Sequence, residues 1–358
     1  MSESHVLGNI PYYGATGIQG YVDDYIFNED LLLVGEDGAD WSPFGKTAYI
    51  IRGKSWVNNH AHVLRAIKIN LYYLKEYLVT SDLRKYVNGS TRGKLNLNAL
   101  EKIPILHPEY TEQSKIAKII STWDKAIELK EKLIEEKREF KIGLMQKLLK
   151  GEMRSPEFAG DWKKVVIGDI FEEVKRINDD ISMDLDILTI SAKHGFLSQK
   201  DKFSKIIAGS SLKKYTHLLQ NEFAYNKGNS KTAPFGCIFK LDIKEGLVPF
   251  VYICFRPTQT IDVDFFDFYF KHGLLDRQLK RIITSGARSD GLLNVSKNHF
   301  FNIKISLPSI EEQKKIGLTL KLIQNEIDYL VDELTQLKEQ KKGLMQLLLT
   351  GIVRVEVD

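Results

Sequence analysis

The chain has 358 residues, of which 43% are hydrophobic and 27% charged, and its formal net charge is +4. This balance is ordinary for a globular protein with two or three hydrophobic cores, and no run approaches the roughly 20 apolar residues of a membrane-spanning helix. No leader-like stretch precedes Gly20, and the only two cysteines, Cys237 and Cys254, lie in apolar sequence without a set of zinc ligands. We therefore expect a cytoplasmic protein that holds no metal or other cofactor.

Residues 1–107 form the first of two mixed segments. The apolar runs Leu31–Val34 and Ala48–Ile51 are typical of strands, and glycine turns such as Gly14–Gly17 separate the runs. Residues 155–307 have the same character. The sequence therefore predicts an α+β protein with two globular domains.

Each globular segment is followed by a predicted long helix, at residues 108–154 and 308–354. In the second helix, apolar residues recur at alternating spacings of four and three, which is typical of a coiled coil. They are Ile316, Leu320, Ile323, Ile327, Leu330, Leu334, Leu337, Leu344 and Leu348, with Lys341 as the interruption. In the first helix, three lysines occupy positions of this apolar register. The seam of the first helix is therefore weaker, or it faces something other than the second helix. We expect an antiparallel pair with Leu330 and Leu337 in the seam.

The two helical segments are copies of one another. Residues 108–154 match residues 308–354 without a gap, at an offset of 200 and with 16 identities in 47 positions. The identities cluster at the two ends, as Pro-x-x-x-Glu-Gln-x-x-Ile and as Gly-Leu-Met-Gln-x-Leu-Leu-x-Gly-x-x-Arg. A gapless match of this length indicates that the chain is an internal duplication.

The closing stretches of the two globular segments also resemble each other. Each has a glycine turn that contains an arginine, then a Leu-Asn pair, then a short apolar run. The corresponding ranges are Gly89–Gly93, Leu95–Asn96 and Ile103–Ile105 in the first segment, and Gly286–Ser289, Leu293–Asn294 and Ile303–Ile305 in the second. The order along the chain is therefore globule, helix, globule, helix.

Taken together, these motifs resemble the specificity subunits of type I restriction-modification systems over essentially the whole chain. The likeness rests on Trp162–Ile170 (Trp-Lys-Lys-Val-Val-Ile-Gly-Asp-Ile), which is similar to the opening of a domain in that family, and on the duplicated turns and helix ends. The resemblance implies that each globule is a target-recognition domain that reads one half of a bipartite DNA site. It also implies that the helices space the two half-sites, and that the chain is not itself an enzyme.

The same resemblance implies the partners. Double-stranded DNA is the ligand, two methyltransferase subunits dock along the helices, and motor-nuclease (restriction) subunits join the assembly. Two readers on a rigid spacer imply two short DNA sequences a fixed distance apart. Because the two globules differ in sequence, the site is expected to be asymmetric.

One departure from the family pattern concerns the first globule. The opening that runs from Trp162 to Asp169 has no counterpart before Gly8. The first recognition domain is therefore predicted to lack an opening strand and helix, which puts its ability to read DNA alone in doubt.

The candidate DNA contacts are basic and amide side chains near turns, since Arg and Lys bind phosphate or guanine and Asn can read adenine. Between Lys193 and Lys231 there are eight lysines but only two acidic residues, an excess that attracts a polyanion. The candidates in the glycine turns are Arg92, Lys94 and Arg288. Those in the second globule are Lys193, Lys213, Lys214, Tyr225, Asn226, Lys227, Asn229 and Lys231.

Three stretches resemble enzyme motifs but depart from them. Gly38 and Gly45 are separated by six residues where a phosphate loop has four, and a predicted strand follows where that loop needs a helix. Asn9–Tyr12 differs from the Asn-Pro-Pro-Tyr of adenine methyltransferases, and no methyl-donor loop precedes it. His60 and His62 lack further metal ligands, so we expect them to hydrogen-bond within their domain. The alternative to a DNA reader is a non-catalytic coiled-coil adaptor whose globules bind proteins.

Overall fold

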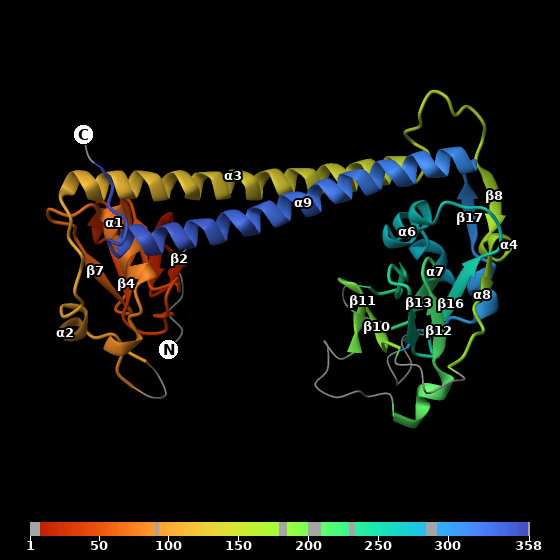
Figure 1. Ribbon diagram of the computed structural model, residues 1–358, viewed down its shortest axis with the longest axis horizontal. Helices are drawn as coiled ribbons and strands as arrows, with labels where there is room; N and C mark the ends of the chain where they lie inside the picture. The colour runs from red at the N-terminus through yellow and green to blue at the C-terminus, as the bar shows by residue number, and fades with distance from the viewer. Residues whose placement is uncertain are drawn as a thin grey trace. The chain divides into compact units, whose positions relative to one another are not determined.

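The computed structural model describes residues 8–89, 93–178, 185–199, 209–228, 233–283 and 292–356. The chain forms two compact units: unit 1 comprises Met1–Leu133 and Leu330–Asp358, and unit 2 comprises Ile134–Tyr329. Both mix strands with helices (Figure 1), which confirms the predicted α+β class. Within the described ranges, no helix is long and apolar enough to cross a membrane.

Unit 1 contains two small sheets. The first has the order β2-β1-β6-β3 and the second β5-β4-β7, and β4 pairs antiparallel with both of its neighbours. The bounds are β1 (Ile10–Gly14), β2 (Gly17–Val22), β3 (Phe27–Asn28), β4 (Leu31–Gly35), β5 (Ala48–Ile51), β6 (Lys54–Val57) and β7 (Ala61–Leu64).

Strand β4 is buried on both faces, because alternate side chains of a strand point in opposite directions. Leu32 and Val34 pack against Leu74 and Leu78 of helix α1 (Leu71–Thr80). Leu31 and Leu33 pack into a second cluster on the opposite face, with the side chains of β5 and β6. A run of four apolar residues in the sequence is therefore a strand between two cores.

Unit 2 is built around the four-stranded sheet β14-β13-β16-β9 and three two-stranded sheets, β10-β11, β12-β15 and β17-β8. The strand bounds are β8 (Lys163–Val166), β9 (Phe171–Glu173), β10 (Leu188–Ser191), β11 (Gly195–Ser198), β12 (Thr216–Leu219), β13 (Phe223–Asn226), β14 (Cys237–Lys240), β15 (Glu245–Val248), β16 (Ile253–Pro257) and β17 (Lys304–Leu307). The helices of its globule are α4 (Ile167–Ile170), α6 (Val263–Lys271), α7 (Asp276–Ile282) and α8 (Lys297–Phe301), and a 3-10 helix, η2, spans Gly209–Lys214.

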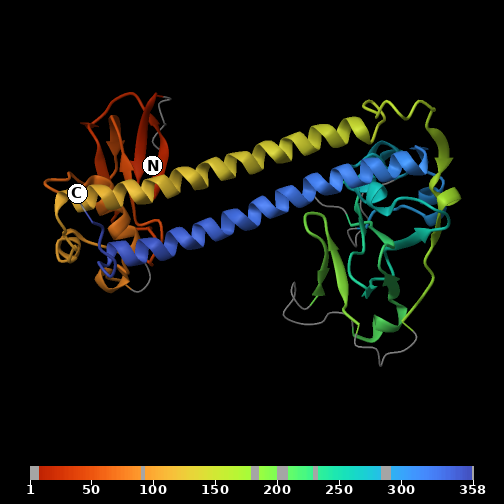
Figure 2. The same cartoon turned by 45° about the horizontal axis from the view of Figure 1, so that its top comes forward.

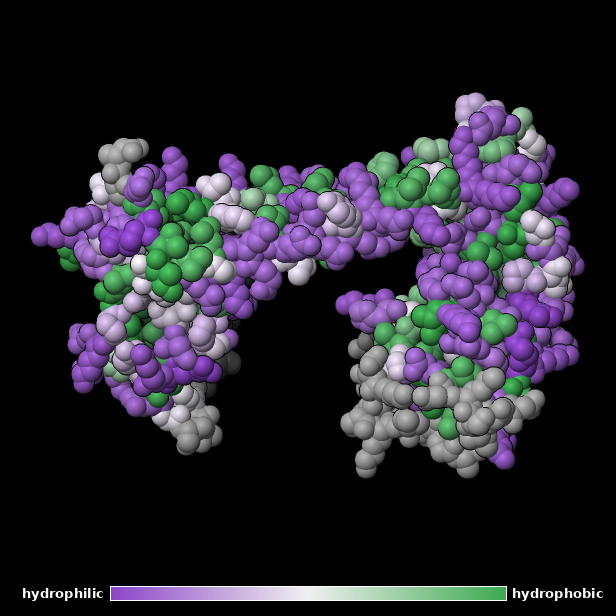
Figure 3. Space-filling model, viewed as in Figure 1, coloured by the Kyte–Doolittle hydropathy of each residue, from purple (hydrophilic) through white to green (hydrophobic). Residues whose placement is uncertain are grey.

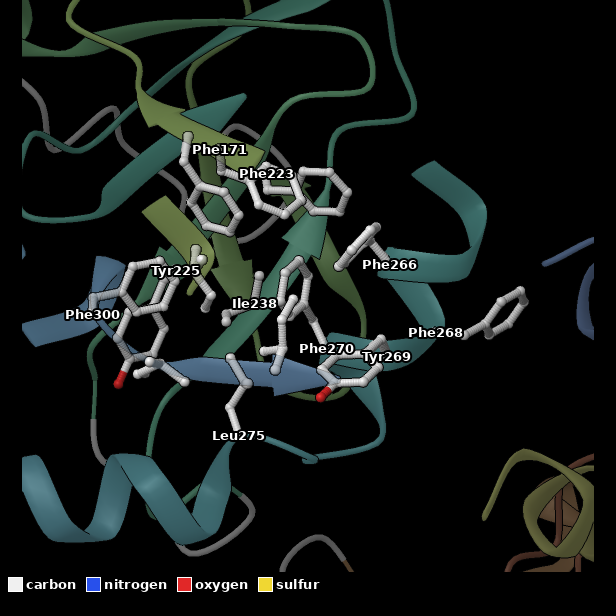
Figure 4. Packing of buried hydrophobic residues seen from close by; sticks show 14 of the residues in the cluster. Phe171, Phe223, Tyr225, Ile238, Phe266, Phe268, Tyr269, Phe270, Leu275 and Phe300 are labelled. Carbon is white, nitrogen blue, oxygen red and sulfur yellow. The ribbon is translucent and has the colours of Figure 1, made fainter. Parts of the chain in front are cut away.

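An aromatic core holds the main sheet of unit 2 to α6 (Figure 4). Phe171 lies edge-on to Phe223, Phe255 and Phe266, at ring-centroid distances of 5.7, 5.2 and 5.1 Å. Edge-to-face contacts are favourable because the positive rim of one ring meets the negative face of the next. The sequence Phe-Phe-Asp-Phe-Tyr-Phe of α6 therefore supplies much of this core.

The two globules share one plan, with α1 equivalent to α6. Strand β4 corresponds to β13. Helix α1 follows β7, which pairs with β4, and helix α6 follows β16, which pairs with β13. Asn70 caps α1 by accepting from the Tyr73 N–H (3.0 Å), and Asp262 caps α6 by accepting from the Phe265 N–H (2.7 Å). In the described part of unit 1, no element corresponds to β8, α4 or β9. The shortened opening of the first globule stays a prediction, since residues 1–7 lie outside the described residues.

Helices α3 (Tyr110–Leu148) and α9 (Ile310–Leu349) pair antiparallel within each unit (Figure 2). In unit 1, Ile116 and Ile120 of α3 pack with Met345 and Leu348 of α9, near the Tyr73 side chain of α1. In unit 2, the seam side chains join the globule core, which includes Met145, Leu149, Ile316 and Leu320. The predicted antiparallel coiled coil is confirmed.

The three seam lysines of α3 face polar side chains of α9 rather than an apolar partner. Lys130 pairs with Glu333 (2.9 Å) and Lys137 with Glu326 (2.6 Å). Lys141 donates to the amide oxygen of Gln324, and at the duplicated position Lys341 pairs with Asp124. These contacts favour the observed register, because only this alignment gives all three lysines their acceptors at once.

The duplicated Glu-Gln and Arg positions meet in space, each helix start contacting the end of the other helix. In unit 1, Arg354 binds Glu112 through two hydrogen bonds of 2.8 and 2.6 Å. In unit 2, Arg154 binds Glu312 in the same way, at 2.7 and 2.8 Å. Both carboxylates are buried, which makes this bidentate contact a strong one. We call each such Glu–Arg pair a clamp.

The glutamine next to each clamp ties its helix to the globule. Gln113 donates to the Pro108 carbonyl (2.7 Å) and accepts from the N–H of the α1 cap, Asn70 (2.8 Å). Gln313 donates to the Pro308 carbonyl (3.0 Å) and accepts from the N–H of the α6 cap, Asp262 (3.1 Å). The identities at the ends of the repeat therefore mark the joints between globule and helix pair.

Replacing both Leu330 and Leu337 by Asp is expected to lower the free energy of unfolding by several kcal/mol, because each change puts an unpaired carboxylate into the seam. Urea denaturation followed by circular dichroism measures the loss. The matched control is Leu322→Asp, since Leu322 lies on α9 but is 59% exposed. Equal stability of the double variant and the control would show that the seam lies elsewhere.

The Glu112 clamp is expected to make stability depend on pH. The hydrogen bonds from Arg354 hold the pKa of Glu112 below its usual range. Glu112 therefore binds a proton more readily in the unfolded chain than in the folded one. The stability that the clamp contributes is fully present above the ordinary glutamate pKa, and it is lost as pH falls through the lowered pKa of Glu112. Glu112→Gln should cost about 1–3 kcal/mol at pH 7, since Arg354 is largely open to water, and less in acid. Unfolding curves at pH 7, 5 and 3.5 test this, and a cost that does not change with pH would contradict it.

Candidate nucleic-acid interface

Lys213 and Lys214 lie exposed at the end of η2 in unit 2. The next residue, Tyr215, is buried with Leu247 of β15 and anchors the turn. Among the described residues, no carboxylate lies within 4.0 Å of either lysine. β12 follows directly and pairs antiparallel with β15. Within the described ranges, the two lysines are thus exposed charges without an acidic partner.

Lys193 lies in the turn between β10 and β11. The turn closes at Gly195, whose φ of 69° is a left-handed conformation that favours glycine. The Lys193 side chain is exposed and has no carboxylate within 4.0 Å in the described part of the chain. A hollow of about 540 Å³ beside the turn also contains Asp186 and Asp242, so it does not select for an anion. The exposed tip of the hairpin is the basic feature.

Tyr225 and Asn226 are part of the framework. Tyr225 is fully buried, donates its hydroxyl to the Phe235 carbonyl (2.7 Å) and stacks on Phe300 at 5.3 Å. Burial raises the pKa of this phenol, so it stays a neutral donor. The Asn226 amide donates to the Ile190 carbonyl (3.1 Å), and its oxygen accepts from the Gly228 N–H (2.9 Å).

These placements contradict the prediction that Tyr225 contacts DNA, because the ring cannot reach a ligand without opening the core. They also leave the Asn226 amide engaged at both its oxygen and its nitrogen. Lys227 is half-buried, and its carbonyl accepts from the Leu293 N–H at 2.9 Å. Residues 225–227 are therefore part of the framework of the globule. Asn229 and Lys231 lie outside the described residues.

The glycine turn of unit 1 is closed by a backbone pair. Asn88 donates to the Lys94 carbonyl (2.9 Å) and Lys94 donates to the Asn88 carbonyl (2.8 Å). The Lys94 ammonium pairs with Glu36 at 3.0 Å, so its charge is compensated locally. Arg92 in this turn and Arg288 in the second turn both lie outside the described residues.

Some basic side chains of unit 1 are paired. Arg65 binds Glu29 (2.6 Å) and Arg84 binds Asp82 (2.6 Å), in addition to the Lys94 pair. In unit 2, η2 and the β10-β11 turn carry basic side chains that no described carboxylate pairs with. These lysines are the candidate phosphate contacts of unit 2.

Sequence reasoning missed a further basic surface on α7. Its three basic side chains are exposed, and none has a carboxylate within 4.0 Å among the described residues. Arg277, Lys280 and Arg281 recur at spacings of three and four, so they share one helix face. The spacing was readable in the sequence, but the short helix between glycines gave no long periodic signal.

The histidines and cysteines have structural surroundings. His60 bonds to Asp37 at 3.0 Å and His62 to the Leu95 carbonyl at 2.6 Å, which confirms the predicted hydrogen bonding within the domain. Burial raises the pKa of the Cys237 thiol to about 11 and that of Cys254 to about 12. The described residues contain no group of three or more side chains able to hold a metal ion.

Comparison with known proteins points to one family. Residues 3–137 match the family model described as the type I restriction modification DNA specificity domain. A putative type I restriction enzyme specificity subunit of Haemophilus influenzae is 38% identical over 120 residues, which are 33% of this chain and 31% of that protein. The putative MjaX specificity subunit of Methanocaldococcus jannaschii is 27% identical over 332 residues, 87% of this chain and 74% of that one.

Over most of its length, this chain is similar to specificity subunits of type I restriction-modification systems. Solved structures share the fold. The S subunit of a type I system from M. genitalium aligns with a TM-score of 0.55 at 17% identity, over 96% of this chain and 89% of that one. The HsdS subunit of Thermoanaerobacter tengcongensis aligns with a TM-score of 0.50 at 15% identity, over 92% and 82%. The family predicted from the repeat is confirmed.

Tyr225→Phe tests the framework role of this tyrosine in the specificity subunit. Removing the hydroxyl leaves the buried Phe235 carbonyl without its donor, so we expect the free energy of unfolding to fall by about 1–3 kcal/mol. DNA affinity at fixed salt should stay unchanged. A variant with normal stability but weakened DNA binding would restore Tyr225 as a contact residue.

Proposed function

We propose that this specificity subunit reads a bipartite, asymmetric DNA site and directs methyltransferase and nuclease subunits to that site. The observation that carries the proposal is the duplicated plan. Two globules with the same order of strands and helices, but different side chains, are each joined to the helix pair by the same glutamine contact beside the clamp. One plan with two different surfaces suits two different half-sites at a fixed spacing.

The recognition domains are proposed as residues 1–107 and 155–307, with the spacer helices within residues 108–154 and 308–354. DNA is proposed to approach the end of each globule that carries the turns. In unit 2, η2 and the β10-β11 turn offer Lys193, Lys213 and Lys214, with which no described carboxylate pairs. Arg92, Arg288, Asn229 and Lys231 lie outside the described residues and remain candidates. Phosphate neutralisation by such side chains supplies the sequence-independent part of affinity.

Unit 2 is proposed to supply most of that affinity. In unit 1, Arg65, Arg84 and Lys94 are each held by a neighbouring carboxylate, so binding phosphate there would require breaking an ion pair. Unit 1 also lacks, among its described residues, the strand and helix that open the globule of unit 2. Both features weaken its contribution to DNA affinity.

The helix pair is proposed to dock methyltransferase subunits, two in number to match the duplication. Leu318, Leu322 and Tyr329 of α9 are 58, 59 and 64% exposed and recur at spacings of four and seven. Figure 3 shows apolar patches on the helices. Exposed apolar residues that follow one helix face mark a surface that another protein covers. The motor-nuclease subunits would join the assembly through these partners.

Replacing Lys193, Lys213 and Lys214 together by Ala should weaken binding to all duplex sequences. The slope of log affinity against log salt should fall by up to about 0.9 for each phosphate that the variant no longer neutralises. Fluorescence anisotropy of a labelled duplex over a salt series measures both quantities. Arg92→Ala should have a smaller effect.

The matched control removes the same charge from Lys244, Lys297 and Lys315, each of which pairs with a carboxylate in unit 2. Its salt slope should stay close to that of the wild type. Loss of binding in Arg92→Ala, with normal binding in the Lys193/Lys213/Lys214 variant, would place the DNA on unit 1.

The purified chain is expected to show no methyltransferase or nuclease activity by itself, and to support adenine methylation when a methyltransferase subunit is added. Methylation-aware sequencing of a random DNA library would read the two half-sites and their spacing. Turnover by the isolated chain would overturn the proposal. Methylation that needs the chain but recognises no sequence would favour the adaptor alternative, in which the globules bind proteins.

A further inference from the structure

Strand β17 of unit 2 is completed by the segment that follows the Arg154 clamp. β17 pairs antiparallel with β8, with Ile305 opposite Val165. The Ile167 N–H donates to the Ile303 carbonyl (2.9 Å), whereas the Lys304 N–H turns away and donates to Gln278 (3.0 Å). Because the two edges of a strand alternate, the odd-numbered residues of this strand face β8.

The segment also brings a tryptophan onto the clamp. The Trp162 indole N–H donates to Glu312 at 3.1 Å. Its ring lies over Gly151, so close that a Cβ at that glycine would be 3.3 Å from the ring. The Arg154 side chain is consequently only 23% exposed. Residues Trp162–Ile167 thus have two roles. They pair with the edge of β17, and they shield the clamp from solvent.

Among the described residues, the equivalent edge is unpaired in unit 1. Residues Ile103–Leu106 are equivalent to Ile303–Ser306 at the repeat offset, but no described residue pairs with them as a strand. The carbonyls of Pro104 and Leu106 accept from the hydroxyls of Tyr77 (3.3 Å) and Tyr73 (2.9 Å), on the α1 side. The Ile105 N–H and carbonyl face the opposite way and have no hydrogen-bond partner in the described part of the chain.

The place that corresponds to the indole is filled only in part. A hollow of about 390 Å³ lies beside Glu112, Leu106 and Gly351. In unit 1, Leu106 lies next to Gly351, as Trp162 lies next to Gly151 in unit 2. Leu106 is nevertheless 42% exposed. The Arg354 side chain is 68% exposed, against 23% for Arg154. The clamp of unit 1 therefore lacks the cover that the other clamp has.

The chain takes a similar course after both clamps. Lys115 donates to the Glu356 carbonyl, and its repeat equivalent Lys315 donates to Ser155 (3.1 Å) and Glu157. In unit 2 this course continues to β8. The same geometry in unit 1 leads toward the open edge.

We propose that the open edge Ile103–Leu106 of unit 1 accepts a tryptophan-bearing strand with the chemistry of Trp162–Ile167, supplied by a second polypeptide. The strand would run antiparallel with a β-branched residue opposite Ile105, and its indole N–H would donate to Glu112. This is the arrangement that unit 2 makes within its own chain. The proposal does not depend on the function proposed above.

A labelled peptide of residues 159–170, added to the full chain, tests the edge. Fluorescence anisotropy should show saturable binding of one peptide per chain, and hydrogen exchange should show protection at residues 103–107 but not at 303–307. N-methylation of the peptide at Val165 removes the donor that faces Ile105 and should weaken binding about tenfold. N-methylation at Lys164, whose N–H points away, is the matched control and should change affinity by no more than about twofold. Trp162→Ala in the peptide should also weaken binding.

A second arm makes the contact intramolecular. Residues 159–170 are appended directly after Asp358, which keeps the repeat offset of 200. This extended chain should melt at a higher temperature than the original chain and should no longer bind the peptide. The same extension with proline in place of its valine equivalent to Val165 should do neither. Equal affinity of both N-methylated peptides, protection at 303–307 instead, or absence of binding together with an unchanged melting temperature would overturn the proposal.

Discussion

The buried pairing of a glutamate at the start of one long helix with an arginine just past the end of the other is the constraint on which this molecule depends. Leaving the glutamate alone would strand a buried charge, whereas leaving the solvent-exposed Arg354 alone should cost about 1–3 kcal/mol. The bidentate geometry allows little freedom in distance or rotation. With the neighbouring glutamine held to the α1 or α6 cap, it sets helix register and globule orientation at one point. The residues kept through the duplication are those of this joint.

Away from the joints, the two halves have diverged in chemistry while keeping one plan. Unit 2 is organised around phenylalanines in edge-to-face contact, and the lysines of its η2 have no carboxylate partner among the described residues. Unit 1 has a smaller aliphatic core, and ion pairs such as Arg65–Glu29 on its surface. Such divergence is what a duplicated reader requires, because a shared frame fixes the geometry and different surfaces fix what is bound.

The helices, their pairing and the duplication could be predicted because period and repeat are properties of the sequence itself. The partners of the seam lysines could not. Lys137 meets Glu326 only at one antiparallel alignment, and the apolar period is the same at every alignment that differs by a heptad. Tyr225 was misplaced for a related reason. It sits in the apolar strand Phe-Ala-Tyr-Asn, but the surrounding lysines suggested a surface, and strand burial depends on which elements cover the sheet.

The division of the chain into units has a consequence for how the protein is made. Unit 2 is continuous in sequence, so it can fold as soon as its last residue has left the ribosome. Unit 1 is not: its globule is synthesised first, yet its clamp needs Arg354, which lies near the other end of the sequence. During synthesis the first globule must therefore wait, with part of its apolar surface uncovered, for more than two hundred residues to follow. Premature termination near residue 350 would damage the beginning of the protein rather than its end.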